Sequence, residues 1–308
     1  GMWLYDILAM FRNYKRHKML SRRRTSEAEP MLARKGLRGA ALYYDCRTDD
    51  ARLTLETALD AEQHGAVITT YSECVSLVED SIGNTVGALV RDGLDDAGIA
   101  GTGPPSEPFT VRARVTVSAT GPWTDSLLEG RVGGPLLRPT KGSHVVLDNA
   151  RLSVKHAVVL TAKDGRVMFA IPWGKRTIIG TTDTDESEGP DGLEASGADV
   201  DYLLETANSH FPTLNATRAD VISTWSGLRP LMGDPDSESA SDVSREHAIL
   251  NIDPGLVAIV GGKLTTYRLM AEQVVDKVLN KLGTQAKLDP CRTKEVPLMG
   301  ASDPNALG

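Results

Sequence analysis

Four side chains lie in short stretches that could do chemistry: His144 in KGSH, Arg229 in SGLRP, Arg245 in SREH and Lys263 in GGK. An imidazole titrates near neutral pH and can accept a hydroxyl proton. A guanidinium group keeps its charge and can bind two oxygens of a phosphate or a carboxylate at once. Taken singly, such residues are usually surface, ion-pair or hydrogen-bonded structural residues. Together they are our candidates for catalysis and substrate binding.

Two further stretches combine a buried strand, a glycine and the start of a helix. The first is ATGPWTD, residues 119–125, and the second is LVAIVGGKLTTYR, residues 256–268. Such a crossing lets the backbone approach a ligand at the carboxyl edge of a sheet, and it aims helix N–H groups at an electron-rich group. One crossing alone is as typical of an ordinary tight turn. The pair, with Lys263 at the second crossing, favours a bound cofactor.

The elements that must position these residues follow from the periodicity of the chain. An amphipathic pattern with acidic residues at its start and Gly65 at its end predicts a helix over residues 49–65. We expect strands within residues 39–45, 66–80, 81–90 and 108–119. Between the two crossings, short strands separated by turns, with one helix at residues 195–212, predict a mainly antiparallel sheet inserted into an α/β domain.

Composition places the chain among globular proteins. It has 308 residues, of which 41% are hydrophobic and 24% charged, enough for one large or two ordinary domains. The net charge of −7 gives no global attraction to nucleic acid or to an anionic membrane. The three cysteines lack metal-ligand spacing, and Asp183 and Asp185 in TTDTDE have no ligand set around them. We therefore expect reduced thiols, no metal site and no nucleic-acid partner.

The first 24 residues have a different character. Trp3, Leu4, Ile7, Leu8 and Phe11 lie at helical spacing, and seven basic residues with no acidic one follow between residues 12 and 24. Such a segment can lie on a membrane surface. The alternative is a helix packed on its own domain and followed by a solvated basic loop. No apolar run approaches the roughly 18 residues that span a bilayer.

Seven stretches, in one order and with compatible spacing, resemble the FAD-dependent glycerol-3-phosphate dehydrogenases of the mitochondrial and bacterial aerobic type. They are YYDCRTDDARLTLETALDA, ATGPWTD, KGSHVV, GRVMFAIPWGKRTIIGTTDTDE, WSGLRPL, SREH and GGKLTTYRLMAE. The resemblance runs from about Leu4 to Val296 and thus covers nearly the whole chain.

The resemblance implies an α/β (mixed α+β) fold: a partial FAD-binding domain of the glutathione-reductase/amine-oxidase type with an inserted, mainly antiparallel substrate domain. The implied substrate domain comprises residues 1–48 and 128–252, the FAD-binding domain residues 49–127 and 253–283, and a linker residues 284–308. The family opens with a strand, a G-x-G-x-x-G turn and a helix, and it ends in a helical domain. Neither is found here, so we expect an internal fragment that is inactive alone and has lost tight FAD binding.

The activity that the resemblance implies is oxidation of sn-glycerol 3-phosphate to dihydroxyacetone phosphate, with hydride transfer to N5 of FAD. It implies catalytic roles for His144, Arg229 and Lys263, and substrate binding by these three and Arg245. Which group takes the proton stays open. The implied FAD contacts are Val75, Ala119, Thr120, Gly121, Gly261, Gly262, Lys263, Leu264, Thr265 and Thr266.

Other functions fit part of the pattern. Electrons could pass to quinone or, in oxidase relatives, to oxygen. The arginines could instead hold a carboxylate in an FAD-dependent amine or amino-acid oxidase, and a truncated chain could be a non-catalytic module. The resemblance further implies peripheral association with the bacterial cytoplasmic membrane or the mitochondrial inner membrane. An apolar face left exposed by truncation would favour a homo-oligomer.

Overall fold

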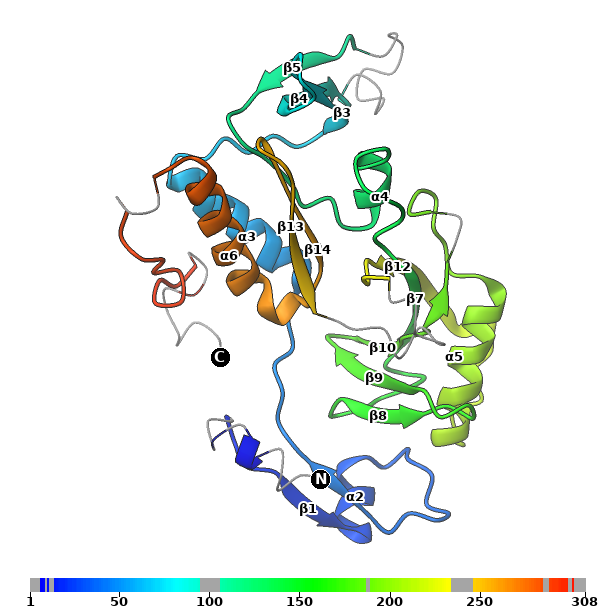
Figure 1. Cartoon of the computed structure of the whole chain (residues 1–308). Helices are drawn as coiled ribbons and strands as arrows, with labels where there is room; N and C mark the ends of the chain where they lie inside the picture. Colours follow the sequence, from blue (N-terminus) through cyan, green and yellow to red (C-terminus); the bar gives the residue numbers. More distant parts are fainter. Residues whose placement is uncertain are drawn as a thin grey trace. The chain divides into compact units, whose positions relative to one another are not determined.

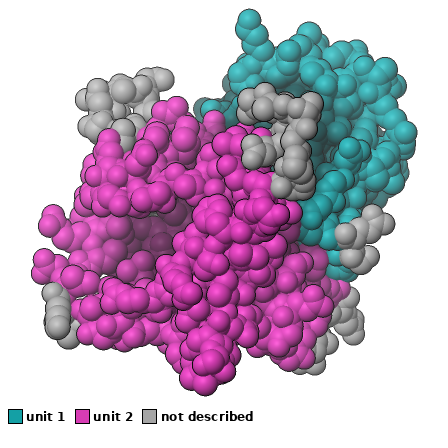
Figure 2. Space-filling view, turned by 90° about the horizontal axis from the view of Figure 1, so that it is seen from above, with its two compact units in different colours: residues 1–47, 140–228 teal, residues 48–139, 229–308 magenta. Residues whose placement is uncertain are grey.

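The computed structural model describes residues 6–8, 10, 14–94, 106–186, 189–233, 246–284, 288–298 and 301. The chain forms two compact units, which Figure 1 shows as a cartoon and Figure 2 distinguishes by colour. Unit 1 consists of Gly1–Arg47 and Thr140–Leu228, and unit 2 of Thr48–Pro139 and Arg229–Gly308. The sequence placed the boundaries after residues 48, 127 and 252, whereas the units change over after residues 47, 139 and 228.

Unit 1 is built on a six-stranded sheet, and every strand pair whose register is given in it is antiparallel. Its strands are β7 (Thr140–Asp148), β8 (Val158–Thr161), β9 (Val167–Trp173), β10 (Arg176–Gly180), β11 (Thr184–Asp185) and β12 (Val221–Arg229). The order is β11-β7-β10-β9-β8, and β12 also pairs with β7. The antiparallel sheet predicted between the two crossings is therefore confirmed.

One helix covers this sheet and closes the core of unit 1 (Figure 1). The helix predicted at residues 195–212 is α5 (Gly197–His210), and Ser196 and Asp199 form a capping box at its start. Its apolar side pairs with the inner face of the sheet: Leu203 and Ala207 are fully buried in one cluster with Leu147 and Ile179. This packing fixes β7 and β10 against a rigid support.

The N-terminal residues of unit 1 differ from the expected solvated loop. Residues Lys18–Ser21 form strand β1, which pairs with β2 (Gly39–Leu42), and Arg22–Ala28 form helix α2. For residues 18–24 the alternative of a loop was wrong, because these residues form β1 and the start of α2, which Ser21 caps by accepting a hydrogen bond from the N–H of Arg24; their basic side chains are exposed, as that alternative expected. Most of the helix predicted at residues 3–11 lies outside the described residues.

Unit 2 contains two small sheets. In the first, β13 (His247–Asp253) pairs antiparallel with β14 (Leu256–Gly261), which pairs in parallel with β6 (Thr116–Ser118). The second is an antiparallel sheet of β3 (Ser72–Glu79), β4 (Thr85–Asp92) and β5 (Phe109–Arg112). Its helices are α3 (Asp50–Gln63), α4 (Thr124–Leu127) and α6 (Tyr267–Lys281). The predicted helix at residues 49–65 is thus confirmed as α3, which Asp49 caps.

Two strand predictions need correction. Residues 108–119 alternate like one strand, but they form β5 in one sheet and β6 in the other. The stretch SREHAILNI was assigned to the inserted sheet, whereas β13 forms a hairpin with β14 through the turn at Pro254 and Gly255. Alternation along the chain predicts an extended backbone but does not identify the neighbouring strand.

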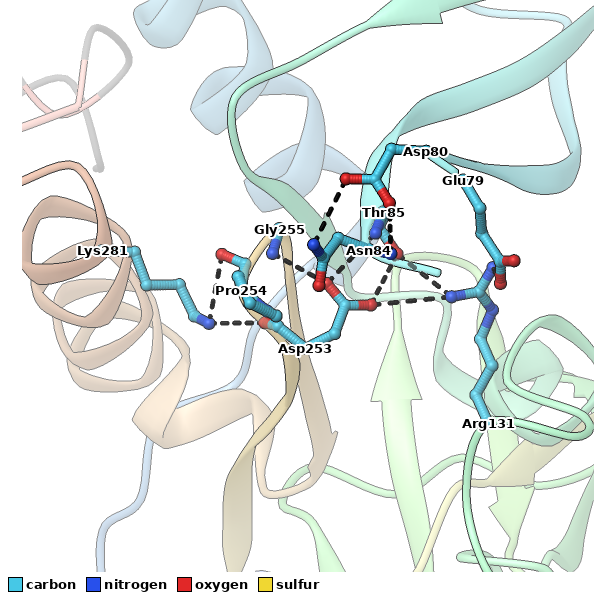
Figure 3. A network of polar contacts seen from close by, with 9 residues as sticks. All are labelled: Glu79, Asp80, Asn84, Thr85, Arg131, Asp253, Pro254, Gly255 and Lys281. Atoms are coloured by element: carbon cyan, nitrogen blue, oxygen red, sulfur yellow. Dashed lines mark hydrogen bonds and ion pairs between the residues drawn. The ribbon is translucent and has the colours of Figure 1, made fainter. Parts of the chain in front are cut away.

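Asp253 joins the two sheets of unit 2 (Figure 3). Its carboxylate accepts hydrogen bonds from Thr85 N–H (3.2 Å), Thr85 Oγ1 (2.7 Å) and Gly255 N–H (2.7 Å). Arg131 lies 3.6 Å from the same carboxylate, and Lys281 of α6 donates to the Asp253 carbonyl at 2.6 Å. A Cβ on Gly255 would lie 1.8 Å from the Thr85 carbonyl oxygen, so the β13–β14 turn rests directly on β4.

Among the helices of the described residues, none combines the length and the hydropathy that a membrane span requires.

Candidate functional site

The two predicted strand–glycine–helix crossings are confirmed, and they lie side by side in unit 2. Strands β6 and β14 are parallel neighbours, with Ser118 opposite Ala258, so their carboxyl ends meet at one edge of the sheet. Strand β6 continues into a 3-10 turn at Gly121–Trp123 and then α4. Strand β14 continues into a 3-10 turn at Leu264–Thr266 and then α6. Ala119, Thr120 and Gly121 are thereby placed at the same edge as residues 261–266.

The glycines at this edge have backbone conformations that side chains disfavour. The φ angles are 53° at Gly121, 73° at Gly261 and 99° at Gly262. A Cβ on Gly261 would lie 2.6 Å from the carbonyl oxygen of Glu246, and one on Gly262 would lie 2.5 Å from Cε of Met270. The backbone contact thus requires a glycine at position 261, whereas at position 262 the end of the flexible Met270 side chain could move and the positive φ angle is what favours glycine.

Lys263 has an extended backbone (φ −126°, ψ 147°) and an exposed side chain. Its carbonyl oxygen accepts hydrogen bonds from the N–H and the hydroxyl of Thr266, both at 3.0 Å, which starts the 3-10 turn. Leu264 and Thr265 are exposed as well. The first N–H groups of a helix have no acceptor within it, so this exposed turn can present donors to an electron-rich group.

A chain of hydroxyl groups fixes the first crossing. Ser118 Oγ lies 3.1 Å from Thr120 Oγ1, which lies 3.3 Å from Thr124 Oγ1, and Thr124 donates to the carbonyl of Gly121 at 2.8 Å. Ser118 and Thr124 are buried. The sequence analysis selected Thr120 but missed Ser118 and Thr124, which the same ATGPWTD region contains or adjoins.

Val75, the candidate contact for the adenine side of FAD, lies at an irregularity of β3. Its neighbours Cys74 and Ser76 pair with consecutive residues of β4, so Val75 has no Cα partner there. Its side chain is 41% exposed. A bulge of this kind leaves the ladder locally interrupted and is frequent beside binding sites.

His144 belongs to unit 1, where it lies in β7 directly opposite Gly180 of β10. Its imidazole stacks on the indole of Trp225 in β12, with ring centroids 4.8 Å apart and the planes 13° from parallel. The preceding residue, Ser143, has its hydroxyl 2.7 Å from that of Ser226. Trp225 is a residue that the sequence analysis missed, although it lies in the stretch WSGLRPL.

The structure says less about the two arginines and about the aspartates of TTDTDE. Arg229 is the last residue of β12, is half-buried and is counted with unit 2, as is Lys263. Arg245 lies outside the described residues. Asp183 accepts a hydrogen bond from Arg166 through its carbonyl, and Asp185 pairs with Thr140 at the end of β11. The described part of the chain has no group of three or more His, Cys, Asp or Glu that could hold a metal ion.

Comparison with known proteins identifies the family of this chain. The family model described as FAD dependent oxidoreductase matches residues 4–276. The aerobic glycerol-3-phosphate dehydrogenase of Bacillus subtilis (strain 168) is 39% identical over an alignment of 304 residues that covers 97% of this chain and 53% of that protein. The namesake from Staphylococcus haemolyticus (strain JCSC1435) is 38% identical over 305 residues, again 97% and 53%. The chain thus spans about half the length of the curated relatives it matches.

Solved structures give the same picture of the fold. The glycerol-3-phosphate dehydrogenase from Bacillus halodurans complexed with FAD superposes with a TM-score of 0.75 and 38% identity, over 89% of this chain and 51% of that one. The glycine oxidase from Geobacillus kaustophilus superposes with a TM-score of 0.60 over 88% of this chain and 65% of that one. At 24% identity, the second likeness concerns the fold alone.

Proposed function

Because the chain belongs to the FAD dependent oxidoreductase family, we propose that it serves in the oxidation of sn-glycerol 3-phosphate to dihydroxyacetone phosphate. The observation that carries this proposal is its 38–39% identity to aerobic glycerol-3-phosphate dehydrogenases across 97% of the chain. The paired crossings of unit 2 support the choice of cofactor, and His144, Arg229, Arg245 and Lys263 supply the groups that the reaction needs.

The edge formed by β6 and β14 fits FAD. Two glycine turns and two helix starts meet there, which suits a group with phosphates and a flat ring system. Ala119, Thr120 and Gly121 would hold it at the first crossing and residues 261–266 at the second, while Val75 would offer its backbone from β3. When bound, FAD supplies the hydride acceptor of the reaction.

The remaining roles fall to side chains of the chain itself. His144 would accept the proton of the C2 hydroxyl at a ring nitrogen, because an imidazole is a base near neutral pH. Arg229 and Arg245 would bind the phosphate oxygens in pairs and so orient the substrate. Lys263 would place a positive charge beside the flavin ring, which gains negative charge when it is reduced.

The substrate is tested on the purified protein in its complete form, loaded with FAD and kept without oxygen. Glycerol 3-phosphate is expected to bleach the flavin absorbance within seconds, whereas glycine, sarcosine and proline leave it unchanged. The reverse result would replace the proposal with an amino-acid oxidase, the second candidate, for which the glycine-oxidase likeness gives only the fold. Flavin that no substrate reduces would refute both functions.

We further propose that the protein associates with an anionic membrane surface, where a quinone would accept the electrons. Residues 15–38, which we call the basic segment, contain nine Lys and Arg residues against two Glu, in a chain whose net charge is −7. All nine basic residues are exposed, whereas Glu29 is buried and accepts hydrogen bonds from the backbone of Lys155 and His156. Tyr14 and Met19, at 83% and 67% exposure, add apolar side chains. Basic residues interleaved with apolar ones are typical of binding to anionic lipid.

Sedimentation with lipid vesicles tests this association. Binding is expected to vesicles that contain phosphatidylglycerol, to weaken with added salt, and to be absent from pure phosphatidylcholine. Glutamine at Arg22, Arg23 and Arg24 is expected to reduce binding at least tenfold. Glutamine at Lys163, Arg176 and Arg218, three basic residues elsewhere on unit 1, is expected to leave it unchanged. Equal loss in both triple variants would contradict a role for the basic segment.

A further inference from the structure

The imidazole of His144 is held from two sides within unit 1. On one side, the indole of Trp225 stacks on it at 4.8 Å between centroids. On the other, Gly180 faces it from β10: a Cβ built there would lie 2.1 Å from Cδ2 and 2.8 Å from Cγ of His144. Only a residue without a side chain can stand at position 180 while the ring keeps this place.

We infer that Trp225 and Gly180 are positioning residues, which hold the His144 ring in the orientation that its proton-accepting role requires. The inference rests on the proposed function for that role, but the geometry that carries it belongs to unit 1 alone. Neither residue was among the candidates predicted from the sequence.

Such positioning is needed because a histidine in a strand is not fixed by its own backbone. Two χ1 wells are common for strand residues, and the χ2 torsion of histidine is broad. A base must lie within hydrogen-bond reach of the proton it accepts, and a displacement of about 1 Å can cost ~100-fold in rate. With Trp225 stacked on one side of the ring and the backbone of Gly180 on the other, the ring is held in one orientation.

The frame that carries the two contacts is itself fixed. Strand β7 is paired on both sides, with β10 and with β12. The hydrogen bond between the hydroxyls of Ser143 and Ser226 joins the residues next to His144 and Trp225. The N–H of Ser143 donates to the hydroxyl of Thr182 at 2.8 Å, on the other side of β7. The ring is thus held by neighbours whose own backbones are bound to its strand.

The ring contact is tested by NMR of the protein labelled with ¹⁵N-histidine. Its six histidines give few side-chain signals, and the variant His144→Gln identifies that of His144. Stacking on an indole shifts the carbon-bound ring protons upfield, so the shift is expected to vanish in Trp225→Leu and to persist in part in Trp225→Phe. Trp173→Leu is the matched control, because Trp173 is a similarly exposed indole that packs on Arg47 in the same unit.

The second side is tested with a matched pair of glycine substitutions. Gly180→Ala places its Cβ against the imidazole, whereas Gly227→Ala, in β12, meets no atom within 4 Å. Both glycines lie outside the left-handed region, so alanine is tolerated by both backbones. We expect the His144 signals to move in Gly180→Ala and to stay in place in Gly227→Ala.

The consequence for catalysis is measured in the complete protein loaded with FAD. Trp225→Leu and Gly180→Ala are expected to lower kcat for glycerol 3-phosphate about tenfold with little change in KM. Trp225→Phe is expected to recover most of the loss, and Trp173→Leu and Gly227→Ala to match the unaltered protein. Ring signals that are the same in Trp225→Leu and the unaltered protein would overturn the inference alone. An unchanged kcat in His144→Gln would overturn the proton-accepting role itself.

Discussion

The second crossing places two glycines with positive φ angles directly before an exposed lysine. Gly261 and Gly262 have positive φ angles that favour glycine, and a Cβ on Gly261 would also collide with the backbone carbonyl of Glu246. Lys263 follows at once in extended backbone with its side chain exposed. The turn therefore places an exposed cation where it is available to a bound group.

The arginine proposed to bind the substrate phosphate gives a prediction at this scale. Arg229→Lys keeps the charge but loses the planar fork that binds two oxygens at once, so KM for glycerol 3-phosphate is expected to rise at least tenfold. Glycerol, which has no phosphate, should be oxidised at the same low rate by both proteins. The exposed Arg218, paired with Asp201, serves as the control: Arg218→Lys should leave KM unchanged. A KM that Arg229→Lys does not alter would remove Arg229 from the phosphate site.

The sequence predicted some of these residues and not others. The glycines and Lys263 were predicted because a strand, a glycine and a helix start are all local features of the chain. Trp225 and Gly180 were missed, since their contact with His144 joins residues 36 or more positions apart, across three strands. No spacing rule along one strand predicts which residue of the next strand lies opposite.

At the scale of elements, the site edge depends on how the hairpin of β13 and β14 is held. Asp253 ends β13 and binds β4 through Thr85, while Lys281 binds the carbonyl of Asp253 from α6. Arg131 completes the connection with Glu79 of β3 at 2.6 Å (Figure 3). The strand that leads to Gly261 is therefore tied to the other sheet of unit 2 and to the helix that follows it.

The pH dependence of this network is a second prediction. Burial alone would raise the pKa of Asp253, but the hydrogen bonds from Thr85 and Gly255 and the charge of Arg131 lower it below its usual value. The folded pKa thus lies below the unfolded value of about 3.9, so the stabilisation is present above that pH and is lost as the pH falls through the folded value.

We therefore expect Asp253→Asn to lower the free energy of unfolding at pH 7 by ~1–3 kcal/mol. The difference from the unaltered protein should shrink as the pH falls below about 4, because the protonated carboxyl then resembles the amide. Urea unfolding at several pH values measures it. The exposed Asp201 is the control, and its replacement by Asn should lower the stability less than Asp253→Asn does. A deficit independent of pH would contradict the role of the charge.

The sequence predicted more of the elements than of their pairing. Helices α3 and α5 were predicted because their caps and apolar spacing are local, and Asp49 and Ser196 cap them as expected of such residues. The division of residues 108–119 between two sheets was not predicted, because both halves alternate equally well. The network around Asp253 was not predicted either, since Thr85 lies 168 positions from it.

At the scale of the whole molecule, the chain crosses from one unit to the other three times, after residues 47, 139 and 228. Unit 2 carries the paired crossings, and unit 1 carries His144 with its two positioning residues and the basic segment. The proposed reaction divides in the same way: unit 2 would hold the cofactor, and unit 1 would contribute the base. Substitutions at the glycine turns of unit 2 are therefore expected to affect flavin binding first, and substitutions around His144 in unit 1 to affect proton transfer first.

The central proposal is that the edge of β6 and β14 would hold FAD, and that Arg229 and Arg245 would bind the substrate phosphate. A crystal structure of the complete protein with FAD and dihydroxyacetone phosphate tests it most directly. The account predicts the flavin against Gly121 and Gly261–Gly262, and the phosphate within hydrogen-bond distance of Arg229 and Arg245. FAD bound away from both glycine turns, or a phosphate that neither arginine contacts, would contradict it.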